Sequence, residues 1–332
     1  MPVRLEPIDE HMHALGPEST FNESMYVNGY DAASGMGAWF RIGNRANEGY
    51  AEVTVCLYLP GDRVGFMFGR PAISGNDAFD AGGLRIDVVE PFEHLTIGYD
   101  GRVLVLDDPL AMSDPRRAFA EHPTERCTAS LDITRLGPMF GGEPDEAFER
   151  AGEEFARGHY EQLVLVRGRV QVGDEVFELD GAGLRDHSWG PRTWQAPWYY
   201  RWLTCAAPAG DHGPGWGFML SRIARPDGPG LRGGFVFDGG DLHLCDGGEV
   251  ATQWTGEQHQ REVRFALQAG ERSWRGTGRV LNLIPLRNRR EGKVTRIAEG
   301  LTEWRLEDGR VGHGLSEYLD QIVDGAPVGL AE

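Results

Sequence analysis

The chain has 332 residues, 40% of them hydrophobic and 25% charged, so it holds enough apolar material for the cores of two domains of ordinary size. Its 33 Lys and Arg residues against 51 Asp and Glu residues give a formal net charge of −18, which argues against nucleic acid and anionic membrane surfaces as partners. We identify no secretory signal and no run of about 20 apolar residues, so we expect no membrane span.

Short alternating or β-branched runs between turns predict antiparallel sheet in the first half of the chain. Pro60-Gly61-Asp62 separates two such runs and Asp100-Gly101 separates two more, which is typical of β-hairpins. The predicted strands cover residues 39–42, 51–59, 63–68, 84–89, 95–99, 102–106 and 127–133.

One segment departs from this pattern. Between residues 145 and 157, apolar residues recur at helical spacing among glutamates, with Pro144 before them and Gly158 after them. This predicts a short connecting helix over 144–158, and hence an N-terminal domain over 1–143 and a C-terminal domain over 159–332.

The second half returns to sheet, with a hairpin turn at Gly173-Asp174. Many strands, one helix and no βαβ alternation favour barrels or sandwiches. No dinucleotide-binding, P-loop or nucleophile-elbow motif follows a strand, which argues against nucleotide-dependent enzymes and serine hydrolases. The predicted strands cover residues 163–170, 175–179, 198–205, 217–223, 234–237, 261–267, 273–280, 293–297 and 302–306.

The cysteines are widely separated and form no C-x-x-C pair. This pattern predicts buried free thiols in a reducing compartment, and therefore a cytoplasmic protein. They are Cys56, Cys127, Cys205 and Cys245.

The most unusual stretch is 181–194, with the sequence GAGLRDHSWGPRTW. Asp186 and His187 point to opposite faces of an extended strand, so they cannot form a dyad on one face. If His187 and Trp189 face a cavity, His187 is expected to transfer protons. If the other face is inward, Asp186 takes that role, and apolar surroundings would raise the pKa of its carboxyl group. Alternatively, Asp186 pairs with Arg185 or Arg192, or caps a turn.

Five of the nine tryptophans lie between residues 189 and 216. Aromatic faces suit flat or unsaturated ligands and stabilise positive charge, although the same residues can simply fill a barrel core. The candidate substrate-binding residues are Trp39, Trp189, Arg192, Trp194, Trp198 and Tyr200.

A second motif repeats the first. Residues 312–318 match residues 181–187 as G-x-G-L-x-acid-aromatic. We hypothesise that Asp186 and Glu317 occupy related positions at the ends of barrel strands, where they would serve as a carboxyl pair.

The histidines show no spacing typical of a metal site. His11 and His13 lie near the N-terminus, where we expect solvated side chains. We therefore expect no metal and no organic cofactor.

Three motifs resemble the AttH-like and carotenoid 1,2-hydratase-like proteins (hydroxyneurosporene synthase relatives), in particular a bacterial branch of that group. They are His159-Tyr-Glu-Gln162, Gly183-Leu-Arg-Asp-His-Ser-Trp-Gly-Pro-Arg192 and Gly314-Leu-Ser-Glu-Tyr318. The segments Phe21-Asn-Glu-Ser24 and Gly35-Met-Gly-Ala-Trp39 extend the resemblance to the first half.

This resemblance implies two tandem lipocalin-like β-barrels around apolar cavities, with acid-catalysed hydration of an alkene in some members and cyclisation in fungal relatives. His187 and Trp189 match the His-x-Trp motif of the family, whose members use these residues to contact substrate and steady a carbocation. The Tyr-x-Asp motif of the hydratases does not follow His187 here. Asp186 or Glu317 would then replace its aspartate as the acid.

Taken together, these observations predict an enzyme without organic cofactor that protonates, hydrates, isomerises or cyclises an apolar terpenoid, steroid-like or polyketide substrate. Asp186 is the expected acid or base, and His187 would orient it or relay protons. The alternatives are a non-catalytic carrier of apolar ligands and, third, hydrolysis or lyase chemistry at a metal.

Overall fold

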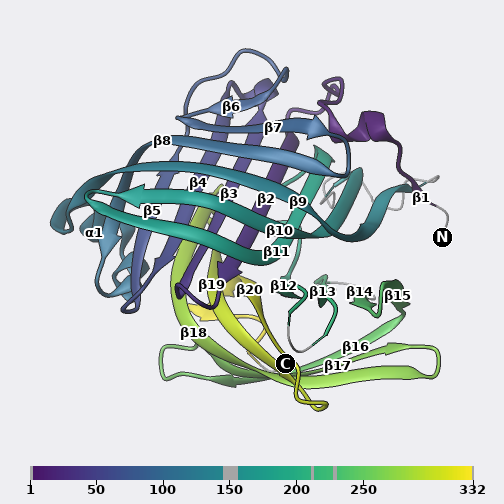
Figure 1. Ribbon diagram of the computed structural model, residues 1–332. Coiled ribbons are helices and arrows are strands. Elements are labelled where there is room, and N and C mark those ends of the chain that lie inside the picture. Colours follow the sequence, from purple (N-terminus) through teal and green to yellow (C-terminus); the bar gives the residue numbers. More distant parts are fainter. Residues whose placement is uncertain (1–2, 145–155, 211–212, 227–229, 331–332) are drawn as a thin grey trace. The chain divides into compact units, whose positions relative to one another are not determined.

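The computed structural model describes residues 3–144, 156–210, 213–226 and 230–330 (Figure 1). The predicted all-β fold is confirmed. The chain divides into two compact units, one formed by residues 1–107 and 121–193 and the other by residues 108–120 and 194–332. Among the described residues, no helix is long and apolar enough to cross a membrane.

The first unit contains a closed barrel of eight antiparallel strands. Each strand pairs with the next along the barrel, β8 pairs with β5 on one edge and with β9 on the other, and β11 returns to pair with β2. The barrel strands are β2 (Phe21–Asp31), β3 (Met36–Arg45), β4 (Tyr50–Leu59), β5 (Arg63–Gly69), β8 (His94–Leu106), β9 (Thr124–Pro144), β10 (Gly158–Val172) and β11 (Glu175–Pro191).

Short elements complete this unit. The strand β1 (Val3–Arg4) pairs with β9, and β7 (Leu84–Glu90) pairs with β8 and with β6 (Phe79–Ala81). Two single-turn helices, η1 (Pro7–Glu10) and η2 (Ala46–Glu48), lie between strands.

Period-two alternation explains the core of this barrel. On β2, Met25 and Val27 face the interior, as Val53, Val55 and Leu57 do on β4, and these side chains belong to one apolar cluster. Every barrel strand contributes a side chain to this cluster or packs one against it. At the barrel end near residues 10–23, buried polar side chains take the place of apolar ones.

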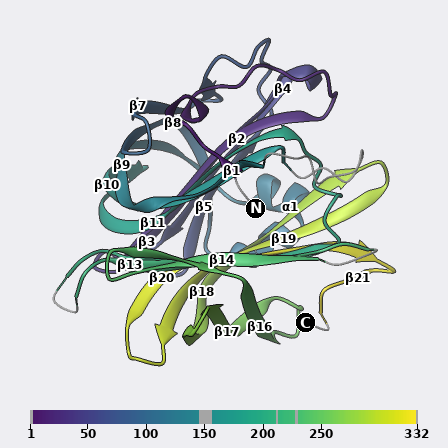
Figure 2. The ribbon, with the colours of Figure 1, turned by 90° about the vertical axis from the view of Figure 1, so that its right-hand side faces the viewer.

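The second unit is a long curled sheet in the order β15-β14-β13-β12-β20-β19-β18-β17-β16. Its first and last strands are consecutive in the chain, and β13 and β14 lie across from β16 and β17 in both views (Figure 1, Figure 2). The strands are β12 (Tyr199–Ala207), β13 (Trp216–Ala224), β14 (Leu231–Asp238), β15 (Asp241–Cys245), β16 (Gly247–Trp254), β17 (Gln260–Ala269), β18 (Arg272–Arg290), β19 (Lys293–Leu306), β20 (Val311–Val323) and β21 (Ala326–Pro327).

Two short helices between β8 and β9, η3 (Pro109–Ser113) and most of α1 (Pro115–Glu121), also belong to the second unit. The apolar core of this unit includes Val236 on β14 and Val263 on β17, from opposite ends of the sheet, because the sheet curls.

The two units repeat one topology. The order β9-β10-β11-β2-β3-β4-β5 in the first corresponds to β18-β19-β20-β12-β13-β14-β15 in the second, and in each unit the last long strand pairs with the first. The tandem lipocalin-like architecture expected from the sequence is therefore confirmed.

The boundary between the units differs from the expected one. The strands β10 and β11, which we assigned to the C-terminal domain, are the last two strands of the first barrel. His159 pairs with Gly142, so the strands on either side of 145–157 are neighbours in one sheet. Most of the expected connecting helix, residues 145–155, lies outside the described residues.

Candidate functional site

Alternate side chains of β11 face opposite sides of the first barrel. His187 lies opposite Met25, a residue of the inner core, whereas Asp186 lies opposite Tyr26, whose side chain points outward. Arg185, His187 and Trp189 therefore point inward and Asp186 points outward. The expectation that His187 orients Asp186 is wrong, because the strand separates the two side chains.

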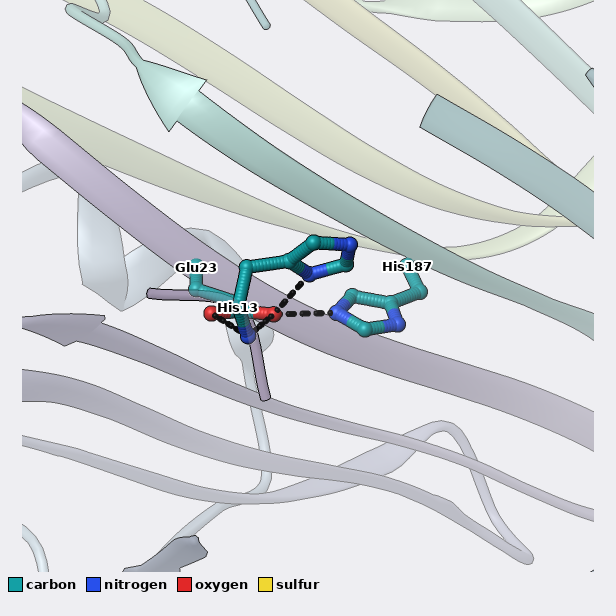
Figure 3. Close-up of side chains that lie close together, drawn as sticks. All are labelled: His13, Glu23 and His187. Atoms are coloured by element: carbon teal, nitrogen blue, oxygen red, sulfur yellow. Dashed lines mark hydrogen bonds and ion pairs between the residues drawn. The ribbon is translucent and has the colours of Figure 1, made fainter. Parts of the chain in front are cut away.

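The inward-facing polar side chains meet at Glu23 of β2 (Figure 3). The Glu23 Oε1 atom lies 2.7 Å from His13 Nδ1 and 3.0 Å from His187 Nε2. Its Oε2 atom accepts hydrogen bonds from the backbone N–H of His13 at 3.0 Å and from Asn76 Nδ2 at 2.5 Å. Burial alone would raise the pKa of Glu23, but the two histidines outweigh it and lower this pKa to about 2.

A second inner cluster adjoins the first through Tyr160 of β10. The Tyr160 hydroxyl donates to Glu10 Oε1 at 2.6 Å and lies 3.1 Å from His187 Nδ1. Glu10 forms a buried bidentate ion pair with Arg185, whose Nε also donates to Gln162. Burial opposes ionisation of Glu10, yet the pKa of Glu10 is lowered because Arg185 is adjacent.

The N-terminal segment supplies two members of these clusters, which the sequence analysis did not foresee. We expected His13 to be solvated, and this is wrong. Its ring stacks on Trp189 with centroids 4.0 Å apart, and only 19% of its side chain is exposed. His13, Glu23 and His187 come from three separate segments, and their ligand atoms lie within 4.8 Å of one another, close enough to hold a metal ion.

The outer face of β11 carries a different set of groups. Asp186 lies opposite Glu161 of β10 and Tyr26 of β2. Glu161 accepts a hydrogen bond from His159, 3.2 Å away. Burial raises the pKa of Asp186 despite the nearby charges of His159 and Arg192. Within the described part of the chain, the Asp186 carboxyl group forms no hydrogen bond or ion pair.

Two other candidate residues share this outer face. Arg192 donates to the Ser188 hydroxyl at 2.9 Å, and Trp39 of β3 stacks against Tyr26 with ring centroids 5.8 Å apart. Asp186, Arg192 and Trp39 therefore belong to one face of one sheet, which we call the outer face.

The remaining candidates lie in the second unit. The Tyr200 hydroxyl donates a hydrogen bond to Glu317, and both side chains are buried. Trp194 and Trp198 precede β12, and the backbone carbonyls of both residues accept hydrogen bonds from Gln321.

Glu317 occupies in the second unit the position that Asp186 occupies in the first. Its register partners are Trp202 and Glu299, which correspond to Tyr26 and Glu161. The leucine two residues earlier donates its N–H to a side-chain oxygen of the neighbouring strand in both units. These bonds are Leu184 to Asn28 and Leu315 to Thr204, both 3.0 Å.

The candidates thus divide into three sets: the inward residues His187 and Trp189, the outer face, and the residues of the second unit. Glu10, Glu23 and Tyr160 were not among the site residues predicted from the sequence. A signal for two of them was present, because Glu23 and Tyr160 stand within the motifs Phe21-Asn-Glu-Ser24 and His159-Tyr-Glu-Gln162 that carry the family resemblance.

Comparison with solved structures finds the same fold in proteins of low sequence identity. A candidate AttH from Nitrosomonas europaea is 15% identical with a TM-score of 0.54, over 92% of this chain and 97% of that one. Kievitone hydratase from Nectria haematococca is 9% identical with a TM-score of 0.57, over 96% and 92%. CghA, solved with Sch210972, is 12% identical with a TM-score of 0.54, over 96% and 95%.

These likenesses establish the double-lipocalin fold that the sequence motifs implied. No curated protein sequence matches the chain. A family model matches residues 6–322, nearly the whole length. The chain therefore belongs to the family described as Domain of unknown function (DUF7064).

Proposed function

We propose that this protein is an acid–base enzyme without an organic cofactor, in which Asp186 transfers a proton to or from an apolar substrate on the outer face. The reaction would be a protonation, hydration, isomerisation or cyclisation, and the substrate class a terpenoid, steroid-like or polyketide molecule. The observation that carries the proposal is the state of the Asp186 carboxyl group, which is partly buried and yet not hydrogen-bonded to any described residue.

The Asp186 carboxyl group differs from its polar neighbours in having no hydrogen bond to a described residue. Glu161 is hydrogen-bonded to His159, and Ser188 to Arg192 and Ser24, so the polar groups around Asp186 already have partners. A carboxyl group left free among them can give a proton to a bound molecule or take one from it. His159 is a diagonal neighbour of Asp186 on the adjacent strand, so its charge acts on the Asp186 carboxyl group.

Aromatic rings beside Asp186 support a substrate that develops positive charge. Tyr26 and Trp39 form a stacked pair, and their faces stabilise a nearby cation. The Trp39 indole N–H is buried without a hydrogen-bond partner among the described residues, so it can donate to an oxygen of a ligand.

The comparisons support the same class of chemistry. Two of the proteins that share the fold are described as a hydratase and as a protein solved with the small molecule Sch210972. At 9% and 12% identity they do not define a substrate for this chain, and the proposed substrate class rests on the aromatic pair of Tyr26 and Trp39 beside Asp186.

The test is incubation of terpenoids, steroids and polyketides with the protein in heavy water, followed by mass spectrometry. We expect the native protein to convert a compound with a regiospecific deuterium label or a gain of water, and Asp186→Asn to bind that compound without converting it. Asp180→Asn, which alters an exposed aspartate on the same strand, is the matched control and should leave conversion unchanged. Binding without label in all three proteins would indicate a carrier, and labelling by Asp186→Asn would remove Asp186 from the reaction.

A further inference from the structure

The contacts of His187 leave its neutral form in conflict with its surroundings. A neutral imidazole has one N–H donor and one acceptor nitrogen. His187 has the Tyr160 oxygen at one ring nitrogen and Glu23 Oε1 at the other. The Tyr160 hydroxyl proton is already donated to Glu10, so the Tyr160 oxygen accepts from His187 Nδ1. The His187 Nε2 lone pair then faces the Glu23 carboxylate.

The His13 ring adds a second nitrogen at the same carboxylate oxygen. Its Nδ1 atom lies 2.7 Å from Glu23 Oε1, while its buried Nε2 atom has no hydrogen-bond partner among the described residues and lies 3.5 Å from Asp9 Oδ1. With the ring proton on Nε2, toward Asp9, the His13 Nδ1 lone pair points at Glu23 Oε1 as the His187 Nε2 lone pair does. In that state two lone pairs and one carboxylate oxygen point to a common place, where a cation can bind all three.

We propose that His13 Nδ1, Glu23 Oε1 and His187 Nε2 bind a divalent transition-metal ion of the Zn²⁺ class inside the first barrel. Two histidines and one carboxylate form a ligand set that proteins use for Zn²⁺, and ligand atoms within 4.8 Å of one another need only small shifts to reach bonds of about 2.0–2.2 Å. Coordination would leave the outer ring nitrogens as N–H donors to Asp9 and Tyr160.

The surrounding contacts match those found around metal ions bound by histidine. Metal-binding histidines almost always donate the second ring N–H to an outer oxygen, which fixes the ring orientation. Tyr160 occupies that position for His187, and for His13 the nearby oxygen is Asp9 Oδ1, 3.5 Å from Nε2 and not yet within hydrogen-bond distance. The far oxygen of Glu23 is held by Asn76 and by the His13 backbone, so its near oxygen stays directed at the two rings.

The position of the ligands indicates a structural role for the ion. His13 follows η1, while Glu23 and His187 lie on the paired strands β2 and β11. An ion bound by all three would fasten the N-terminal segment to the barrel wall. The site faces the interior, on the opposite side of β11 from Asp186, so it is separate from the proposed reaction at the outer face.

Calorimetric titration of the chelator-treated full-length protein with ZnCl₂ tests the proposal, with CoCl₂ as a spectroscopic probe. We expect one ion per chain, a tetrahedral or five-coordinate Co²⁺ absorption spectrum, and a rise in the midpoint of thermal unfolding with Zn²⁺ concentration. His13→Gln should weaken binding by more than the roughly 10–100-fold expected for loss of an outer partner. The matched control is His11→Gln, an exposed histidine two residues away.

Absence of stoichiometric binding to the native protein would overturn the proposal, as would equal affinity in His13→Gln and His11→Gln. Because Glu23 and His187 are fully buried and their variants can fail to fold, Asp9→Asn provides a second measurement. It keeps all three ligands, so it should retain one ion per chain with affinity reduced by about 10–100-fold. An unchanged affinity in Asp9→Asn would contradict the outer-partner geometry on which the site is built.

Discussion

Arg185 is the residue that links the N-terminal segment to the interior of the first barrel. Its guanidinium group is almost fully buried, and its charge is balanced by Glu10 of the N-terminal segment. A buried ion pair of this kind contributes little relative to apolar packing, but loss of one partner leaves an uncompensated buried charge. The pair therefore makes residues 7–10 part of the barrel although they form no barrel strand.

Glu10→Gln should lower the free energy of unfolding at pH 7 by about 3–5 kcal/mol, measured by urea denaturation. The folded-state pKa of Glu10 lies below its ordinary value of 4.5, so its stabilisation is present above pH 4.5 and is lost as the pH falls through the folded pKa. The difference between native protein and variant should therefore shrink at pH 3. Asp100→Asn, which breaks an exposed pair with Arg126, should cost only about 0–1 kcal/mol.

The four cysteines are shielded from reagents in the folded protein. All are free and buried, as expected from the sequence. Burial raises the pKa of Cys127 to about 12 and that of Cys245 to about 11, so little thiolate forms near neutral pH. We expect no reaction with an Ellman-type reagent at pH 8 in the native protein, and four equivalents after denaturation. Rapid reaction of any thiol in the native state would contradict this burial.

At the scale of elements, the repeated G-x-G-L motif has a steric explanation. A Cβ atom on Gly183 of β11 would lie 1.9 Å from the Asn28 carbonyl oxygen, and one on Gly314 of β20 would lie 2.1 Å from that of Thr204. In both units the neighbouring strand approaches too closely for any side chain. The repeated motif thus reflects two equivalent close approaches between paired strands, β11 to β2 and β20 to β12.

Gly183→Ala and Gly314→Ala should each destabilise their unit by about 1–3 kcal/mol or more, because the backbone must move to admit the methyl group. Gly98→Ala on β8 is the control. Its Cβ would meet nothing within 4 Å, and replacing glycine within a strand should stabilise by about 0.5–1 kcal/mol. Urea denaturation of the three variants measures these differences. Equal stability of Gly183→Ala and Gly98→Ala would show that β11 can move away from β2.

The sequence predicted many of the strands and placed Asp186 and His187 on opposite faces of β11, because both depend on local period-two patterns. It did not predict β2 or β20, and the hairpin expected at Asp100-Gly101 is wrong, because β8 continues through these residues while paired with β9. It could not bring His13 to His187, since the two lie 174 positions apart and only barrel closure joins β11 to β2. Glu10 was missed because an isolated carboxylate in a polar segment has no pattern that distinguishes a buried partner from a solvated one. Glu23 stands in a family motif, but the motif alone did not assign it a partner.

At the scale of the whole molecule, the position of the domain boundary depends on strand pairing rather than on composition. The Pro- and Gly-rich stretch before residue 144 has the composition of a linker, yet it lies within β9, which pairs with β10 in one antiparallel ladder with a register shift between Gln162 and Val164. Closure of the first barrel requires β11 to pair with β2, so the first unit ends at residue 193. Linker-like composition alone therefore does not identify a domain junction.

Two fragments test this boundary. Residues 1–193 contain all eight barrel strands together with Glu10, Arg185 and His187, so this fragment should fold with a cooperative thermal transition and sheet-type circular dichroism. Residues 1–143 lack β10 and β11, which leaves β2 and β9 as unpaired edges and Glu10 without its cation. This shorter fragment should be unfolded or aggregated. If residues 1–143 folded cooperatively and residues 1–193 did not, the strands 158–191 would belong to the second unit after all.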